Sequence, residues 1–351
     1  MAKTLMDVKN LIKNFEIEAG TVKAIGDITF SIKENEVFGL VGESGSGKST
    51  TGKVLMGIHP PTEGKLTFKG QDISIPTMER AKSLKKDMNM VFQDPGGSLN
   101  PTKTVLDIVS LPLRIHDMVD GSEDMVAKVY ELLELVDMDP ERFMYRRPND
   151  LGQGEKQAVA IARAIATDPS FIVLDEPTSA LDVSQQAKIM NILIELQDEY
   201  NMAYLFITHD LGLMRNIADR VAIMYLGKFF ELADVDVFFE TPLHPYTRVL
   251  LGSFPTTTKE EERLTPDLKA IGEIPSAMKL PSGCKFHTRC PFKEERCTEI
   301  EPELVEVQEG HYVACHLVHG VDDVEYDEDE VEYDEIENLE FDNLYDSSTE
   351  T

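Results

Sequence analysis

Basic residues are scarce in this chain of 351 residues, in which 34 Lys and Arg stand against 64 Asp and Glu, a formal net charge of −30. A nucleic-acid-binding protein needs a basic face to contact phosphates, so this balance argues against that class. The deficit is uneven, because residues 321–351 carry 15 acidic side chains and no Lys or Arg. We predict that residues 319–351 form a disordered acidic tail. The tail is either a solvated extension or a docking segment for a basic partner.

Long apolar runs are also missing. No stretch approaches the ~20 apolar residues of a membrane-spanning helix. The N-terminal stretch MAKTLMDVKNLIKNF lacks the apolar centre of a signal peptide. We therefore expect a soluble, cytoplasmic protein that reaches a membrane only through partners. With 42% apolar residues, the chain is rich enough in them to form a globular core.

Cysteine is absent before residue 284 and then occurs four times, as Cys284, Cys290, Cys297 and Cys315. In a cytoplasmic protein such a cluster favours metal binding over disulfides. The spacing C-x5-C-x6-C-x17-C lacks the two-residue gaps of common zinc ribbons. It suits a four-iron cluster or a tetrahedral zinc site, and free or redox-active thiols are the remaining alternative.

The hydrophobic pattern predicts an α/β protein. Residues 3–33 alternate apolar and polar residues as antiparallel strands do, and further along the chain short apolar strands alternate with helical segments. This alternation indicates a mostly parallel sheet with helices on both faces. We predict a large domain over residues 1–235, with a helical subdomain at about 95–165. A small Pro-rich, Cys-containing domain is expected over 236–318.

A phosphate-binding loop is the clearest motif. The sequence GESGSGKS matches G-x-x-x-x-G-K-[ST] between a predicted strand and a predicted helix, which indicates a P-loop NTPase fold. Glycines let backbone amides close around the phosphates, and the helix N-terminus adds favourable partial charge. Lys48 is expected to reach the β- and γ-phosphates, and Ser49 to hold Mg²⁺. The residues expected to bind the nucleotide here are Gly42, Glu43, Ser44, Gly45, Ser46, Gly47, Lys48, Ser49 and Thr50.

Polar side chains also follow three other predicted strands. Asp175 ends the strand FIVLD, where it can orient Mg²⁺, and Glu176 comes next, where it can polarise a hydrolytic water. His209 and Gln93 follow two further strands, at the ends where open α/β sheets place their ligands. We predict Glu176, His209 and Gln93 as catalytic residues and Ser49, Gln93 and Asp175 as Mg²⁺ ligands. A structural carboxylate pair and an ordinary core or surface His are the alternatives.

The order of these elements resembles that of ATP-binding-cassette (ABC) ATPases, over about residues 3–318. A signature-like turn at 151–155 and the segment LDEP at 174–177 complete the pattern. Within that family, QDPGGSLNP, PLHPYTRVLL and PSGCKFHTRCP resemble segments of the oligopeptide/dipeptide/nickel importer ATPases. The HPY element and the cysteine-containing segment are the specific signs.

The resemblance implies an ATP-hydrolysing subunit of an importer for peptides or nickel, at the inner face of the cell membrane. It implies two cassettes beneath two permease subunits, with an extracellular solute-binding protein acting indirectly. ATP would lie between the phosphate loop of one cassette and the signature turn of the other. The resemblance also implies a 4Fe–4S cluster on the four cysteines and an aromatic side chain stacked on adenine. Phe15 is the candidate for stacking, and packing within the first sheet is its alternative role.

The signature turn departs from the family's LSGGQ. Gly152 lacks the hydroxyl that would bond the γ-phosphate, Gln153 places a side chain where the backbone must approach closely, and Glu155 adds negative charge. Gly154 and the helix opening after it are kept, so we expect some amide contacts to remain. The residues expected at this nucleotide contact are Gly152, Gln153, Gly154 and Glu155. Because this turn serves the opposite chain's nucleotide, we expect a heterodimer with one strong and one weak site. A second possibility is a soluble ABC ATPase that remodels or activates another protein, such as component A2 of methyl-coenzyme M reductase activation.

Overall fold

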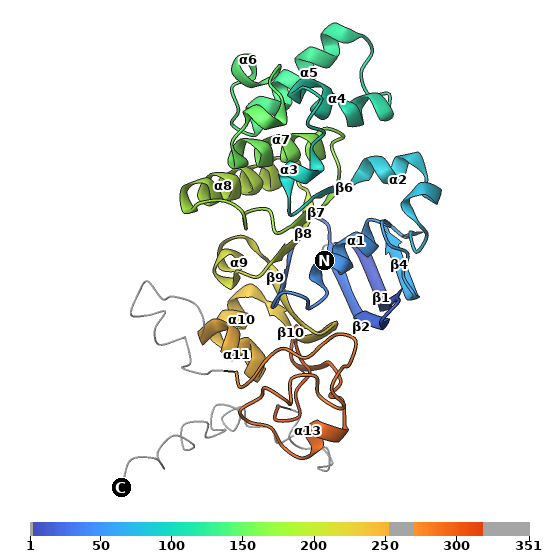
Figure 1. The fold of residues 1–351 in the computed structure, drawn as a ribbon, viewed down its shortest axis with the longest axis vertical. Coiled ribbons are helices and arrows are strands. Elements are labelled where there is room, and N and C mark those ends of the chain that lie inside the picture. The colour runs from blue at the N-terminus through green and yellow to red at the C-terminus, as the bar shows by residue number, and fades with distance from the viewer. Residues whose placement is uncertain (1–2, 253–269, 319–351) are drawn as a thin grey trace. The chain divides into compact units, whose positions relative to one another are not determined.

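The computed structural model describes residues 3–252 and 270–318 (Figure 1). The predicted acidic tail lies outside these residues, so its disorder stays a prediction. Within the described ranges, no helix is both long enough and apolar enough to cross a membrane.

An antiparallel sheet begins the chain, in the strand order β2-β1-β4-β5. Its strands are β1 (Thr4–Ile17), β2 (Gly20–Lys33), β4 (Glu63–Phe68) and β5 (Gln71–Asp72). The long hairpin of β1 and β2 confirms the antiparallel strands predicted for residues 3–33. One face of the hairpin is apolar and fully buried, as Met6, Val8 and Ile32 show.

The second sheet has eight strands, in the order β11-β12-β10-β9-β3-β8-β7-β6. In chain order they are β3 (Val37–Val41), β6 (Met88–Val91), β7 (Phe171–Asp175), β8 (Ala203–Thr208), β9 (Arg220–Tyr225), β10 (Lys228–Asp234), β11 (Val305–Gln308) and β12 (His311–Val313). Five neighbouring strands pair in parallel, as predicted: in spatial order they are β6, β7, β8, β3 and β9. The pairs β9–β10, β10–β12 and β11–β12 are antiparallel, so the complete sheet is mixed.

Helices cover both faces of this sheet. A first group packs together around α7, as Figure 1 shows: α3 (Pro95–Ser98), α4 (Val105–Ile115), α5 (Ser122–Leu135), α6 (Pro140–Phe143) and α7 (Gln153–Ile165). These helices fall within residues 95–165, over which a helical subdomain is predicted. The remaining described helices are α1 (Lys48–Leu55), α2 (Lys82–Asp87), α8 (Val183–Tyr200), α9 (Leu211–Ile217), α10 (Val235–Glu240), α11 (Pro245–Gly252) and α13 (Arg296–Glu299), with short 3₁₀ turns at Thr77–Glu79 and Pro148–Asp150.

The core lies on the two faces of the central strands. Successive residues of a strand point to opposite faces. Tyr204 and Phe206 of β8 therefore join the cluster beneath the helical subdomain. Leu205 and Ile207 join the cluster that faces α1 and the antiparallel sheet. Every residue of β3, β7 and β8 is buried, which explains their continuously apolar sequences.

The C-terminal region continues this fold. Strand β12 pairs with β10, and residues up to Val318 belong to the same compact unit as the rest of the described chain. A separate Cys-containing domain is therefore not confirmed. The predicted boundary after residue 235 falls within α10, directly after its first residue.

Candidate active site

The phosphate loop joins β3 to α1 and depends on its glycines. Gly42 has φ 156° and Gly47 has φ 111°, conformations that favour glycine. Neighbouring backbone atoms also leave no room for a side chain at either glycine. A Cβ on Gly42 would lie 2.1 Å from the carbonyl oxygen of Met224, and one on Gly47 would lie 2.4 Å from that of Ala24. The strand β9 and the hairpin β1–β2 therefore hold the loop closely from outside.

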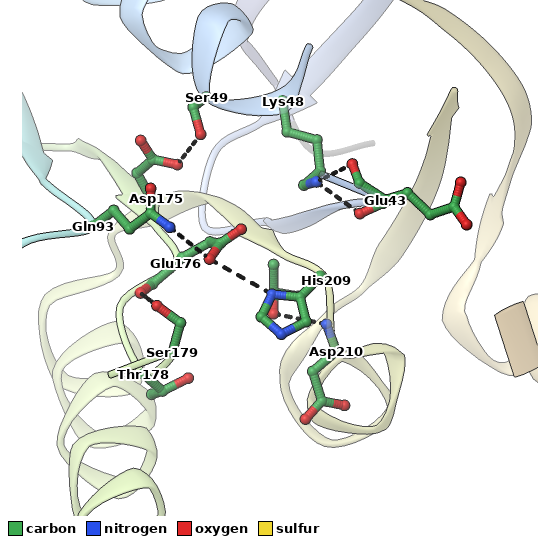
Figure 2. A network of polar contacts seen from close by, with 12 residues as sticks. Glu43, Lys48, Ser49, Gln93, Asp175, Glu176, Thr178, Ser179, His209 and Asp210 are labelled. Atoms are coloured by element: carbon green, nitrogen blue, oxygen red, sulfur yellow. Dashed lines mark hydrogen bonds and ion pairs between the residues drawn. The ribbon is translucent and has the colours of Figure 1, made fainter. Parts of the chain in front are cut away.

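Lys48 lies across the loop that it follows. Its ammonium group donates to the carbonyl oxygens of Gly42 at 2.7 Å and Glu43 at 3.0 Å (Figure 2). Burial lowers the pKa of Lys48, whereas the negative charges of Glu176, Asp175 and Glu43 raise it. Backbone carbonyls of the phosphate loop therefore hold the Lys48 ammonium group.

Ser49 and Asp175 meet, as the Mg²⁺ prediction requires. The Ser49 hydroxyl donates to Oδ1 of Asp175 at 2.6 Å. Burial raises the pKa of Asp175, and the Ser49 hydrogen bond and Lys53 oppose that shift. A hydroxyl and a carboxylate at one point are oxygen ligands of the kind Mg²⁺ takes. The third predicted ligand, Gln93, instead bonds to Glu176.

Glu176 is the centre of a second cluster, shown in Figure 2. Gln93 Nε2 donates to Glu176 Oε2 at 2.9 Å, and His209 Nδ1 lies 3.5 Å from the same oxygen. The three predicted catalytic side chains therefore come together. Glu176 also has φ 47°, a left-handed conformation that is uncommon outside glycine and recurs at functional sites. Its amide donates to Ile207 O on β8, which helps hold it there.

The signature turn is capped by its own side chain. Glu155 Oε2 accepts the Gly152 N–H at 2.8 Å, so a carboxylate of this chain bonds an amide at the start of α7. Gln153 is the first residue of the helix. Gly154 is closely packed, because a Cβ there would lie 2.7 Å from Gln185 Oε1. The sequence suggested only added charge at Glu155, and the structure shows that its carboxylate also caps the helix.

Phe15 is not a core residue. Its ring is only partly buried, with the Lys13 ammonium 4.8 Å from its centroid and the His59 ring edge-on at 5.1 Å. The core-packing alternative is thus disfavoured, and stacking on adenine stays a prediction.

The four cysteines are free thiols in the structure, and all except the partly buried Cys290 are buried. Burial raises the pKa of Cys284 to about 11 and those of Cys290 and Cys315 to about 12. Among the described residues, no group of three or more His, Cys, Asp or Glu side chains is arranged to hold a metal ion. The predicted iron–sulfur cluster and its zinc alternative therefore find no support in this arrangement.

Two contacts to the phosphate loop were not predicted from the sequence. The Tyr246 hydroxyl accepts the Glu43 N–H, and the Arg289 guanidinium pairs with the Glu43 carboxylate. Tyr246 belongs to the HPY element, which served only as a family marker. Nothing in the sequence around Arg289 indicates a partner 246 residues away.

Comparison with known proteins agrees with this geometry. Residues 25–179 match the family model of the ABC transporter, and residues 230–297 match that of the oligopeptide/dipeptide transporter C-terminal region. The oligopeptide transport ATP-binding protein AppF of Bacillus subtilis is 45% identical over 323 residues, covering 90% of this chain and 98% of AppF. The chain belongs to the ABC transporter ATP-binding proteins.

Two further relatives support this membership of the ABC family. The di/tripeptide transport ATP-binding protein DppF of Pseudomonas aeruginosa is 37% identical over 320 residues, covering 90% of this chain and 98% of DppF. The dimeric ATP-binding cassette MJ0796, solved in a post-hydrolysis state with ADP and Pi, is 30% identical with a TM-score of 0.59. That match covers 66% of this chain and 99% of MJ0796. The predictions of a P-loop fold and of an ATPase are confirmed.

The loop geometry of this ABC ATPase predicts that Gly47→Ala weakens ATP binding at least ~10-fold more than Gly45→Ala. Both residues have positive φ, so both variants carry backbone strain. Only a Cβ at 47 meets backbone, because nothing lies within 4 Å of one at 45. Titration with a fluorescent ATP analogue, with the melting temperature measured in parallel, compares the two variants. Equal affinities in folded variants would contradict the clash.

Proposed function

We propose that this ABC ATPase is the ATP-hydrolysing subunit of a peptide importer. The observation that carries the proposal is the match of residues 230–297 to the oligopeptide/dipeptide transporter C-terminal region. Relatives named for oligopeptide and di/tripeptide transport align with 90% of the chain. These names favour peptides over nickel as cargo. They also favour transport over the remodelling ATPase considered as the alternative.

The nucleotide site works, in this proposal, through the chain's own side chains. Loop amides and Lys48 hold the phosphates, and Ser49 and Asp175 hold Mg²⁺, which neutralises phosphate charge when bound. Glu176 accepts a proton from the attacking water. Both neighbours contact its Oε2, so we assign Oε1 to that water. His209 is assigned to the γ-phosphate.

Removing the base should separate hydrolysis from binding. Glu176→Gln keeps the side chain's shape but cannot accept the proton, so ATP turnover should fall by about 10²–10⁴-fold. ATP affinity should stay within about threefold of the original, because the loop is unchanged. Phosphate release and nucleotide titration measure the two quantities, with Glu34→Gln as an exposed control. Unchanged turnover would remove Glu176 from its assigned role.

The permease subunits are the proposed membrane partners, which would place the chain at the inner face of the membrane. A groove of about 720 Å³ lies beside the catalytic cluster, lined by Gln93, Phe92 and Arg163 among others. Gln93 therefore contacts both Glu176 and this groove. A partner docked there would sense changes at Glu176 through one side chain. The extracellular solute-binding protein would act only through the permeases.

We further propose that the working pair is a heterodimer. The turn of this chain lacks a hydroxyl at Gly152, and its Glu155 carboxylate already bonds the Gly152 amide. Losing one charge-assisted hydrogen bond to phosphate costs about 1.5–3 kcal/mol. The weakened contacts concern the partner's nucleotide. The nucleotide on this chain's own loop would depend on the partner's turn.

The heterodimer proposal predicts that the purified chain alone turns over ATP slowly and without cooperativity. Restoring the family turn with Gly152→Ser, Gln153→Gly and Glu155→Gln should raise that turnover at least ~10-fold, because the γ-phosphate regains its hydrogen bond. ATPase rates against protein and ATP concentration provide the measurement. Cooperative ATP turnover at an ordinary rate by a homodimer of the unaltered chain would contradict the heterodimer proposal.

A 4Fe–4S cluster on the cysteines is the last proposal about function. Its support is the clustering of all four cysteines within residues 284–315. Burial raises the pKa of the Cys284, Cys290 and Cys315 thiols, and the amides of Phe286, Phe292 and Leu317 oppose that shift. Amide bonds to sulfur are among the contacts that tune iron–sulfur sites. Against the cluster stands the lack of a converged metal-binding group among the described residues.

Anaerobic purification tests this proposal directly. The expected preparation is brown and holds about four iron and four sulfide per chain, because four thiolates complete such a cluster. Cys284→Ser should lose iron, whereas the exposed neighbour variant Thr288→Ala should retain it. A colourless protein with four titratable thiols would refute both metal alternatives.

A further inference from the structure

Glu43, the second residue of the phosphate loop, is tied to the C-terminal region by two side chains. Arg289 Nη1 and Nη2 donate to the two carboxylate oxygens of Glu43 at 2.6 and 3.1 Å. The Tyr246 hydroxyl accepts the Glu43 N–H at 3.0 Å. Figure 2 shows the Glu43 carboxylate pointing away from Lys48 and from Glu176. Tyr246 and Arg289, which we call the Glu43 clamp, thus hold the loop from the side opposite the catalytic cluster.

The clamp is itself rigidly held. The Arg289 side chain is only 9% exposed, and its guanidinium lies 5.8 Å from the Tyr225 ring and 5.9 Å from the Phe286 ring. Tyr246 is fully buried, with its ring 4.7 Å from that of Tyr225. Aromatic packing on both sides leaves little freedom to either member of the clamp.

Buried polar contacts fix the segment that carries Tyr246. The Glu231 carboxylate on β10 accepts the N–H groups of Leu243 and His244 at 2.8 and 2.9 Å. It also contacts His311 Nε2 on β12 at 2.8 Å, and neither Glu231 nor His311 is exposed. The position of Tyr246 therefore depends on β10 and β12, two strands from the C-terminal part of the chain.

Charge gives Arg289 a consequence for nucleotide binding. A carboxylate beside a loop that receives polyphosphate repels it, the more so where water is partly excluded. The bidentate pair with Arg289 neutralises that carboxylate and fixes its direction. Arg289 lies between Cys284 and Cys290, so its position depends on how that segment is folded.

We propose that Arg289 is a positioning residue for ATP: it neutralises Glu43 and, with Tyr246, holds the phosphate loop, so that the Cys284–Cys290 segment sets the affinity of this chain's own site. The inference rests on the proposed nucleotide site. It adds that the C-terminal region acts on ATP binding directly, apart from any contact with other subunits.

The test compares nucleotide affinity of three variants of the full chain. Arg289→Ala leaves Glu43 unneutralised, so the Kd for ATP should rise at least ~10-fold. Arg289→Lys keeps the charge but loses the forked geometry, so its Kd should lie between that of the original chain and that of Arg289→Ala. In Glu43→Gln/Arg289→Ala the repelling charge is gone, and most of the lost affinity should return. Titration with a fluorescent ATP analogue gives each Kd, and thermal melting checks the fold.

Arg296→Ala is the matched control. Arg296 lies in the same C-terminal region, in α13, where it contacts Glu294 and His316 O and makes no contact with Glu43 that the structure records. Its removal should leave the Kd within about threefold of the original. An Arg289→Ala chain that binds ATP as well as the original would overturn the inference. So would an equal loss in Arg296→Ala, or a double variant no better than Arg289→Ala.

Linkage supplies a second readout that survives poor folding of Arg289→Ala. If the clamp couples the phosphate loop to the Cys284–Cys290 segment, the coupling is reciprocal. The free energy by which bound ATP stabilises the segment equals the free energy by which the folded segment strengthens ATP binding. Adding ATP should slow hydrogen exchange at those amides in the original chain, and less so in Arg289→Lys. No protection by ATP would also overturn the inference. An original chain that binds no ATP would contradict the proposed nucleotide site itself, which distinguishes the two failures.

Discussion

The parallel register of four strands is the constraint on which the site depends. β6 pairs with β7, β7 with β8, and β8 with β3, each in parallel. Their carboxyl ends therefore meet at one edge of the sheet, and the residue or loop after each strand enters one small volume. Gln93, Glu176, His209 and the phosphate loop follow these four strands. Hydrogen bonds between backbones thus bring together side chains that lie far apart along the chain.

The second organising feature is the attachment of the C-terminal region to that edge. Strand β12 extends the same sheet through β10, and Glu231 on β10 holds the HPY segment in place. Through Tyr246 and Arg289 this region contacts the loop that follows β3. A region that resembles an appendage in sequence therefore contacts the phosphate loop directly. Its folding and the loop's geometry are physically linked.

The two surfaces proposed to bind nucleotide differ in how complete they are. Ser49 meets Asp175, and Glu176 meets Gln93 and His209, so the chain's own site is assembled. At the start of α7, the Glu155 carboxylate accepts the Gly152 N–H. A carboxylate in that position satisfies the helix N-terminus and repels an incoming anion. This contrast between the surfaces is the physical basis of the proposed heterodimer.

The sequence by itself determined the elements and their local chemistry. Glycine spacing identified the phosphate loop, and apolar runs ending in Asp175, Gln93 and His209 identified the strands and the edge where their side chains meet. These signals are readable because they depend on neighbours along the chain. Only the tertiary structure decided which distant groups pair. Arg289 meets Glu43 across 246 residues, Gln93 contacts Glu176 instead of joining Ser49 and Asp175, and the four clustered cysteines do not form a metal-binding group within the described residues. Such pairings follow from how strands and loops pack against one another, which no local pattern encodes.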